Sequence, residues 1–239
     1  MPAQDAGGEA WSLAFAGPGA TGGFLRIVRW PDRAWFWAYL VAPAVGLVVV
    51  RDHDVAPPRG RSPVLRADGL WSELLEETPD EHWTIGLEAF GVRLDDPLDA
   101  EHGERGERLP AGLDLEWEAG AGPYGSVHGM LLAGAARVDV AGTGTFERTT
   151  FGGNPWDGAW RCVTWQRAPT EGTTARDDAV TIEADAARLP VAVEADGVAF
   201  AVTATAVVPA GGRVVLALLE AAVGRGWLEW CQGPTAPGG

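Results

Sequence analysis

The amino-acid sequence predicts an antiparallel all-β protein, either a barrel or a sandwich. About a dozen segments are rich in β-branched and aromatic residues, and most of them alternate between apolar and polar side chains. Turn residues separate these segments at intervals of roughly 8 to 15 residues, as in sandwiches and barrels. Glycine accounts for 33 of the 239 residues, which suits the bulges and tight bends of curved sheets.

The first expected strands follow one another closely. The segment FLRIVRW, which starts at Phe24, alternates in polarity. The segment WFWAYLV places Trp35, Trp37 and Tyr39 on one face of a strand, because successive side chains point to opposite faces. GLVVVRDHDV comes next, and its β-branched composition is also typical of a strand.

Two segments in the middle of the chain alternate more strictly. HWTIGLEAFGVRL places Trp83 on one face and Glu88 on the other. LDLEWEA places Trp117 on the apolar face and Glu116 on the polar face. Further strands are expected at SVHGMLLAG, ARVDVAG, AWRCVTWQR, AVTIEAD, VAVEAD, VAFAVTATAVV and RVVLALLEAAV. The last segment also has a weak helical period, so a short helix and a strand both remain open there.

The longest polar interruption is DDPLDAEHGERGERLPAG, residues 95–112. A structureless stretch of this length inside a compact domain is a candidate crossing element or linker. We therefore expect a domain boundary shortly after it, which divides the chain into an N-terminal β half, residues 1–118, and a C-terminal β half, residues 119–239.

Composition excludes several classes of function. The formal net charge is −15, which disfavours binding to nucleic acid or to an anionic membrane surface. The 18 basic residues are all Arg, so a Schiff-base lysine is not available. The N-terminus lacks the basic and apolar regions of a secretory signal, and no apolar run is long enough to span a bilayer. We therefore expect a cytoplasmic protein.

No motif in the sequence predicts a metal or a cofactor. Cys162 and Cys231 lack metal-ligand spacing and are expected to be buried thiols in a reducing compartment, with a disulfide between them as the alternative. His residues are few and form no zinc-binding pattern. RDHDV could supply Asp52, His53 and Asp54 as metal ligands, but the segment is more typical of the end of a strand. The GTG at Gly142 lacks the rest of a dinucleotide-binding fingerprint, and no P-loop is present.

The stretch GTGTFERTTFGGNPWDGAWRCVTW, residues 142–165, mixes large aromatic and charged side chains between glycines. A core favours the aromatic rings without the charges, and a solvated loop favours the charges without the rings, whereas a ligand pocket uses both. The chain holds twelve Trp residues. The alternative for each of them is ordinary core packing. The candidate pocket-wall tryptophans are Trp35, Trp37, Trp83, Trp117, Trp156 and Trp160.

Several polar side chains are candidates for chemistry. A carboxyl group in an apolar pocket can act as a general acid, and Glu147 and Asp157 are the two candidate catalytic residues because they lie within the 142–165 stretch. The alternative for Glu147 is an ion pair with Arg148. The remaining candidate ligand-binding residues are Tyr39, Glu88, His128 and Arg148.

The order of segments resembles a known superfamily. HWTIGLEAFGVRLDDP, GERLPAGLDLEWEA and YGSVHGMLL are followed by a GxG turn and an aromatic, charged strand, and the ending is GRGWLEW. Over residues 65–232 this pattern is similar to the lipocalin-like superfamily that includes carotenoid 1,2-hydratase (hydroxyneurosporene synthase), uncharacterised bacterial relatives and lipocalin-like Diels–Alderases. The resemblance implies two antiparallel lipocalin-like β-barrel or sandwich halves packed together, with a ligand cavity in or between them.

The chain departs from this pattern after the GxG turn. Relatives usually carry an Asp-His-Ser-Trp-Gly-like run there, whereas residues 147–152 read ERTTFG. Glu147 takes the acidic place and Arg148 the histidine place. If the histidine carries chemistry in relatives, this chain performs different chemistry or none.

The residues and the resemblance together suggest an enzyme of secondary metabolism that works without a cofactor. It would act on an apolar terpenoid or polyketide, by hydration, cyclisation or a pericyclic step, in an aromatic-lined pocket. A carrier that binds a hydrophobic small molecule without turnover is the main alternative. The third is an interaction domain whose Trp residues all belong to the core.

Overall fold

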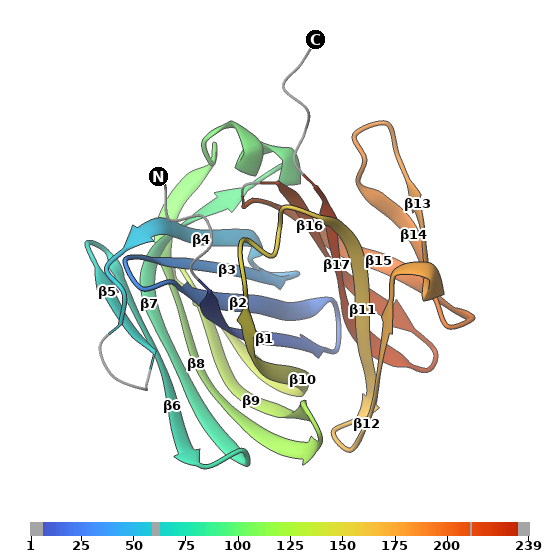
Figure 1. Cartoon of the computed structure of the whole chain (residues 1–239), viewed down its shortest axis with the longest axis horizontal. Coiled ribbons are helices and arrows are strands. Elements are labelled where there is room, and N and C mark those ends of the chain that lie inside the picture. Colours follow the sequence, from blue (N-terminus) through green and yellow to red (C-terminus); the bar gives the residue numbers. More distant parts are fainter. Residues whose placement is uncertain (1–6, 59–62, 211, 234–239) are drawn as a thin grey trace.

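The computed structural model describes residues 7–58, 63–210 and 212–233. It confirms the all-β prediction, with two antiparallel sheets (Figure 1). The strands of the first sheet are β1 (Gly8–Gly17), β2 (Thr21–Arg29), β3 (Ala34–Ala42), β4 (Gly46–Val55), β5 (Val64–Ala67), β6 (Leu70–Thr78), β7 (His82–Leu94), β8 (Glu107–Ala121), β9 (Tyr124–Ala133) and β10 (Ala136–Phe151). Those of the second are β11 (Ala159–Ala168), β12 (Glu171–Arg176), β13 (Val180–Ala184), β14 (Pro190–Ala195), β15 (Val198–Pro209), β16 (Arg213–Ala221) and β17 (Gly224–Gln232). Two short 3₁₀ helices, η1 (Pro97–His102) and η2 (Asp177–Ala179), lie in connections.

Part of the first sheet closes into a ring. The strand order is β4-β3-β2-β1-β10-β9-β8-β7-β6-β5, and β4 also pairs with β7. This additional pairing joins Leu47 to Leu94 and Val49 to Val92, so strands β4 to β1 and β10 to β7 form a closed circuit. The first part of β7 pairs with β6, and β6 with β5, and Leu65 and Leu74 of these two strands are buried in the same core as the ring strands.

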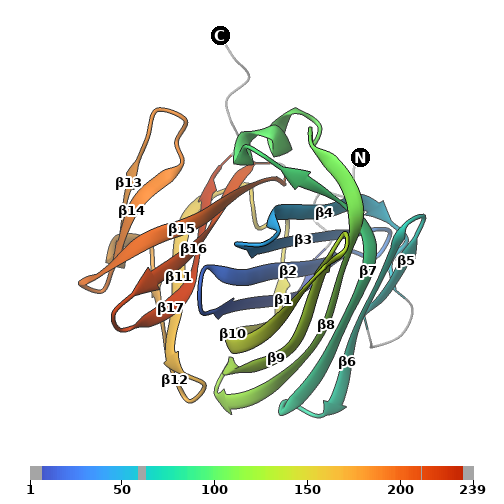
Figure 2. The same ribbon diagram turned by 180° about the vertical axis from the view of Figure 1, so that it is seen from behind.

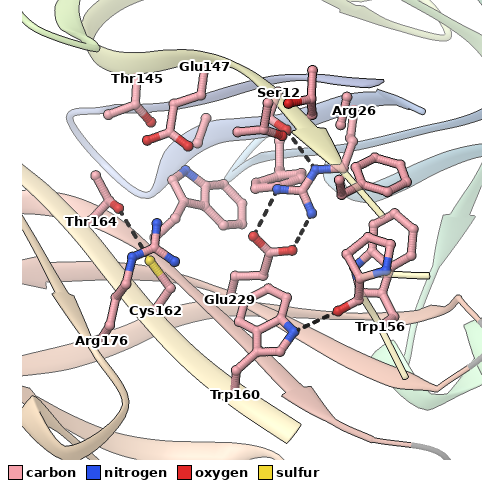
Figure 3. Close-up of a pocket in the computed structure, with 18 residues that line it drawn as sticks. Ser12, Arg26, Thr145, Glu147, Trp156, Trp160, Cys162, Thr164, Arg176 and Glu229 are labelled. Carbon is pink, nitrogen blue, oxygen red and sulfur yellow. Dashed lines mark hydrogen bonds and ion pairs between the residues drawn. The ribbon is translucent and has the colours of Figure 1, made fainter. Parts of the chain in front are cut away.

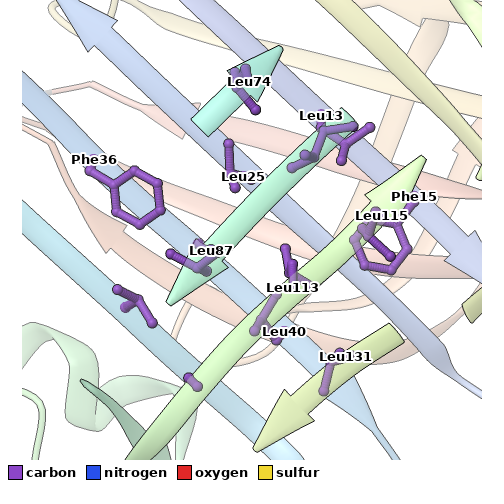
Figure 4. Packing of buried hydrophobic residues seen from close by; sticks show 14 of the residues in the cluster. Leu13, Phe15, Leu25, Phe36, Leu40, Leu74, Leu87, Leu113, Leu115 and Leu131 are labelled. Carbon is purple, nitrogen blue, oxygen red and sulfur yellow. The ribbon is translucent and has the colours of Figure 1, made fainter. Parts of the chain in front are cut away.

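The inside of the ring is filled by side chains. One cluster of buried residues takes inward-facing positions from every strand of the sheet, including Leu13, Leu25, Phe36 and Leu113 (Figure 4). Alternate residues on each strand point inward, which is why the two-residue period of the sequence predicted this core. The cluster also holds aromatic rings at one end, where Trp83 stacks on Phe146 with centroids 4.4 Å apart.

The second sheet covers the outer face of strands β1, β2 and β3 (Figure 1, Figure 2). These strands are therefore buried on both faces: in β2, Leu25 points into the ring whereas Phe24 packs against Trp227 of the second sheet. Buried hydrogen bonds cross this interface, and two of them come from aromatic side chains. Tyr39 Oη donates to the Val207 carbonyl at 3.0 Å, and Trp227 Nε1 donates to the Phe15 carbonyl at 2.8 Å.

The change from one sheet to the other comes between β10 and β11. The boundary expected at residues 118 and 119 lies within β8, whose two neighbours, β7 and β9, belong to the same sheet. Residues 95–106 of the polar stretch connect β7 and β8, which pair with each other from Arg93 and Glu107 onward, and residues 107–112 belong to β8. It therefore does not cross between the sheets, although Glu101 of η1 accepts a hydrogen bond from Arg213 Nε of β16 at 2.6 Å. The two-half division remains a prediction.

Two local expectations change in the structure. The RVVLALLEAAV segment forms strand β16. Its alternate side chains are buried in two different hydrophobic clusters, one on each face of the second sheet. The GTG at Gly142 lies within strand β10 rather than in a turn. A Cβ atom at Gly142 would approach the Ala16 carbonyl oxygen to 2.3 Å, so glycine there permits close pairing with β1.

Candidate ligand-binding site between the two sheets

A cavity of about 360 Å³ lies between the two sheets. Its walls come from β1, β2 and the end of β10 on one side, and from β11, β12 and β17 on the other, with the connection 152–158 closing one end (Figure 3). This volume falls at the lower end of the range of roughly 300–1,000 Å³ typical of small-molecule sites. The wall carries five aromatic side chains, four charged ones and a thiol.

The register of the first sheet places one row of polar side chains on the cavity wall. Glu147 of β10 is the cross-strand partner of Ser12 of β1, and Ser12 is the partner of Arg26 of β2. Directly paired residues project on the same face of a sheet. The three side chains therefore line the cavity side by side, in the order Glu147, Ser12, Arg26.

The second sheet presents a matching row. Arg176 of β12 pairs with Cys162 of β11, and Cys162 pairs with Glu229 of β17. All three side chains line the cavity. Figure 3 shows the two rows facing each other, with Arg26 against Glu229 on one side and Glu147 across from Arg176 on the other.

The first of these facing charge pairs is closed. Both guanidinium Nη atoms of Arg26 donate to the carboxylate of Glu229, with Nη2 to Oε2 at 2.9 Å. Arg26 Nε donates to Ser12 Oγ at 2.7 Å. Each side chain of the ion pair retains only 13% of its exposure. A two-point arginine–carboxylate pair of this kind fixes geometry as well as charge.

The second facing pair is open. In the described part of the chain, neither Glu147 nor Arg176 forms an ion pair or a hydrogen bond to another side chain. Both side chains keep some contact with solvent, Arg176 more than Glu147. The cavity thus holds one carboxylate and one guanidinium that are available to a ligand.

The thiol of Cys162 lies between the two charge pairs. Burial raises its pKa, and the Arg176 guanidinium and a contact with Thr164 Oγ1 at 3.8 Å oppose this shift. The carboxylates of Glu229 and Glu147 add to the rise. Cys162 therefore remains a protonated thiol at neutral pH and is a poor nucleophile there.

Aromatic rings form the rest of the wall. Trp160 Nε1 donates to the Pro155 carbonyl at 3.0 Å, which fixes the ring at the side of the cavity. Trp156 is almost fully buried, and its ring stacks on Trp35 and meets the edge of Trp37, with centroids 5.9 Å and 5.2 Å apart. The other aromatic wall residues are Phe24, Phe151 and Trp227.

The structure brings three of the sequence-predicted site residues together. Glu147, Trp156 and Trp160 all line the cavity. Trp35 and Trp37 lie behind Trp156 and support it rather than forming the wall. The 142–165 stretch therefore contributes to a pocket between the sheets, where the end of β10 leads into β11.

Three other predicted site residues, Tyr39, Asp157 and Arg148, do not line the cavity. Tyr39 is fully buried, and its burial raises the pKa of the phenol well above its usual range. Asp157 is exposed, and its carboxylate accepts a hydrogen bond from Asn154 Nδ2 at 2.8 Å. Arg148 is exposed and forms an ion pair with Glu9 at 3.3 Å, not with Glu147.

The remaining predicted site residues face elsewhere. Trp83 and Trp117 belong to the core inside the ring. Glu88 and His128 are exposed on the outer surface of the first sheet. Their roles in ligand binding have no support from the geometry.

Sequence reasoning missed Ser12, Arg26, Cys162, Arg176 and Glu229. One signal for Arg26 and Glu229 is present in the sequence. The central segments of β2 and β17, FLRIV and WLEWC, are apolar on both faces except for these two charged residues, and such a pattern indicates burial on both sides. A charged side chain on a strand that is buried on both faces needs a partner of opposite charge, so the pattern indicates that Arg26 and Glu229 could pair with each other.

The described residues contain no group of three or more His, Cys, Asp or Glu side chains arranged to hold a metal ion. Nor does the described chain contain a helix with the length and apolar character needed to cross a membrane.

Comparisons with known proteins give only distant likenesses. No protein-family model matches the chain, and no curated protein matches it significantly. Among solved structures, kievitone hydratase from Nectria haematococca is 10% identical with a TM-score of 0.48, covering 98% of this chain and 91% of its own. A candidate AttH from Nitrosomonas europaea is 12% identical with a TM-score of 0.43, covering 95% of this chain and 92% of its own. Similarity of this degree does not define a family for the chain.

Proposed function

We propose that this chain is an enzyme that acts, without a cofactor, on a small and mainly apolar molecule bound between its two sheets, with Glu147 as the proton-transferring residue. One observation carries the proposal: the Glu147 carboxylate lines an aromatic cavity, and no cation in the described part of the chain forms an ion pair with it. An acid held beside aromatic rings is the arrangement that proton transfer to a carbon–carbon double bond requires.

The reaction class that fits is addition to an alkene. In such an addition Glu147 transfers a proton to one alkene carbon, so that a C–H bond forms as the π bond breaks. The faces of nearby rings, such as Trp160 and Trp227, stabilise the carbocation through their quadrupoles. Water then attacks in a hydration, or a second double bond attacks in a cyclisation, and the proton released returns to Glu147. The step is redox-neutral and consumes no other reagent.

The size and lining of the cavity favour a particular kind of substrate. Its volume of about 360 Å³ suits a small terpenoid or a short polyketide rather than a long polyene. For a pericyclic step on such a molecule, the cavity would act by folding the chain into a reactive shape. Such molecules belong to secondary metabolism.

The proposal is tested by finding what the cavity holds. The purified protein is mixed with a small-molecule extract of the cells that produce it, and native mass spectrometry identifies the bound compound. That compound is then incubated with the protein and followed for a gain of one water or for an isomer of unchanged mass. Glu147→Gln should abolish the conversion while the protein still binds the compound, and Glu183→Gln, an exposed change on β13, should convert it normally.

Other outcomes overturn the proposal in distinct ways. A bound compound that remains unchanged over hours identifies a carrier rather than an enzyme. Conversion that persists in Glu147→Gln and disappears in Asp157→Asn transfers the acid role to the exposed residue outside the cavity. Absence of any bound compound removes the cavity as the functional site.

A further inference from the structure

The two facing charge pairs of the cavity differ in one respect. Arg26 and Glu229 are bonded to each other, whereas Glu147 and Arg176 face each other without bonding (Figure 3). Glu147 and Arg26 belong to one row of cross-strand partners, and Arg176 and Glu229 belong to the row that faces it. The strand register therefore places both pairs in the same way, although only one of them forms an ion pair. The space between Glu147 and Arg176 belongs to the cavity instead.

The charge of the cavity wall limits what can occupy that space. The ion pair of Arg26 and Glu229 is neutral as a unit, and Glu147 and Arg176 together also sum to zero. An anionic ligand would be attracted by Arg176 and repelled by Glu147, and a cationic ligand would meet the opposite combination. A neutral ligand with a hydrogen-bond donor and an acceptor satisfies both groups at once, because the guanidinium only donates and the carboxylate only accepts.

We infer that the ligand of this cavity is a neutral, oxygenated molecule that bridges Glu147 and Arg176. A hydroxyl group of the ligand donates to the carboxylate of Glu147, and a carbonyl or second hydroxyl oxygen accepts from the guanidinium of Arg176. The rest of the ligand is apolar and lies against Trp160, Trp227 and Phe151. Arg176 is therefore a second ligand-binding residue, which the sequence did not suggest.

This inference rests on the proposed binding site but not on the proposed proton transfer. Hydrogen bonds to a charged group contribute about 1.5–3 kcal/mol when they form in place of bonds to water. The loss of one should therefore weaken binding by about tenfold or more. Removal of one charge of the open pair should also change which ligand charge the cavity prefers, which a purely structural role would not do.

The test uses four naphthalene probes of similar size at pH 7. They are 2,3-dihydroxynaphthalene (a neutral diol), 2-methylnaphthalene (apolar), 2-naphthoate (an anion) and 2-naphthylmethylammonium (a cation). Isothermal titration calorimetry measures their binding to the wild type and to Glu147→Gln and Arg176→Gln. Glu183→Gln and Arg137→Gln are the matched controls, since they remove the same charges from exposed positions outside the cavity.

The wild type and both controls should bind the diol at least about tenfold more tightly than the other three probes. Glu147→Gln should bind the diol about tenfold more weakly and naphthoate about tenfold more tightly than the wild type does, because Arg176 then attracts an anion without opposition. Arg176→Gln should weaken binding of the diol by a similar factor and strengthen binding of the ammonium probe. Far-ultraviolet circular dichroism and thermal unfolding confirm that each variant is folded.

Three results would overturn the inference. Naphthoate bound most tightly by the wild type would make Arg176 an anion site. Equal binding of every probe by every variant would show that the open pair does not contact the ligand, although the cavity itself binds. Failure of all probes to bind any folded variant would remove the binding site, and with it the proposed function as well.

Discussion

Arg26 of β2 and Glu229 of β17 are 203 positions apart in the chain and form a two-point ion pair across the interface of the two sheets. The pair is largely shielded from solvent and is supported by a hydrogen bond from Arg26 to Ser12. A buried pair gains little over apolar packing, but the loss of one member leaves the other charge without compensation. We therefore expect the pair to specify how the two sheets meet rather than to add much stability.

Replacement of one member should be costly, and replacement of both should be less so. Arg26→Met leaves the Glu229 carboxylate unpaired at the interface and should lower the free energy of unfolding by about 2–4 kcal/mol. The double change Arg26→Met with Glu229→Leu leaves no charge there and should recover a large part of that loss. Urea unfolding measures both. If the double variant were less stable than the single one by a further similar amount, the two losses would be additive, and the two side chains would contribute independently rather than as a pair.

Substitutions of two tryptophans, one in the core of the ring and one in the cavity wall, should have different effects. Trp117 is almost fully buried inside the ring, so Trp117→Ala should lower the free energy of unfolding by about 3–5 kcal/mol. Trp160 is only half-buried and lines the cavity, so Trp160→Ala should cost about 1–2 kcal/mol. The reverse order should hold for affinity toward 2,3-dihydroxynaphthalene, measured by calorimetry. An equal loss of affinity in folded Trp117→Ala would place the ligand inside the ring.

Much of the fold could be predicted because sheets impose a period of two on buried strands. The alternation in LDLEWEA gave the inward face of β8, and Leu113, Leu115 and Trp117 lie in the core of the ring. The position of the sheet boundary could not be predicted, since a long polar loop such as 95–112 gives no sign that its flanking strands pair with each other. That pairing depends on long-range register between Arg93 and Glu107, which composition does not encode.

The candidate site could be predicted only in part, for a related reason. Glu147, Trp156 and Trp160 lie within one stretch of sequence, so local composition was enough to find them. Ser12, Arg26 and Arg176 join them through pairing of strands that are distant in the chain. Trp83 and Trp117 were expected at the pocket because an aromatic residue in a strand looks the same whether it faces a core or a ligand.

The two thiols should differ in reactivity. Cys162 lines the cavity and Cys231 has no exposed surface, and no disulfide joins them. N-ethylmaleimide should therefore label Cys162 first, slowly at pH 7 and faster as the pH rises, because burial raises the pKa of the Cys162 thiol. 2,3-Dihydroxynaphthalene should protect it, and mass spectrometry of the peptides measures each site.

Arg176 provides an internal check on this labelling. Its guanidinium lowers the pKa of the Cys162 thiol, so Arg176→Gln should raise that pKa and slow the labelling at any given pH below it. Arg137→Gln, on the exposed part of β10, should leave the rate unchanged. Faster labelling in Arg176→Gln would show that the arginine shields the thiol by covering it instead.

His53 should make the protein less stable in mild acid. Its ring stacks on Trp35 with centroids 4.7 Å apart, and burial, together with the nearby charge of Arg51, lowers its pKa to about 4. An unfolded histidine has a pKa of about 6.5, so between pH 6.5 and 4 the unfolded chain binds more protons than the folded protein. The free energy of unfolding should therefore fall as the pH is lowered through this window, by up to about 3 kcal/mol from this group.

The contribution of His53 is isolated by comparison with His53→Phe, which keeps a ring against Trp35 and removes the titrating group. Burial raises the pKa of Glu104, so the folded protein holds a proton there more tightly than the unfolded chain does. The contribution of Glu104 to the free energy of unfolding therefore falls as the pH rises above 4.5, which is opposite in direction to that of His53. Glu104 is present in both proteins, so the difference between their urea unfolding free energies at each pH reports His53. That difference should shift in favour of the variant between pH 6.5 and 4. Two parallel stability profiles would mean that His53 is protonated as easily in the folded protein as in the unfolded chain.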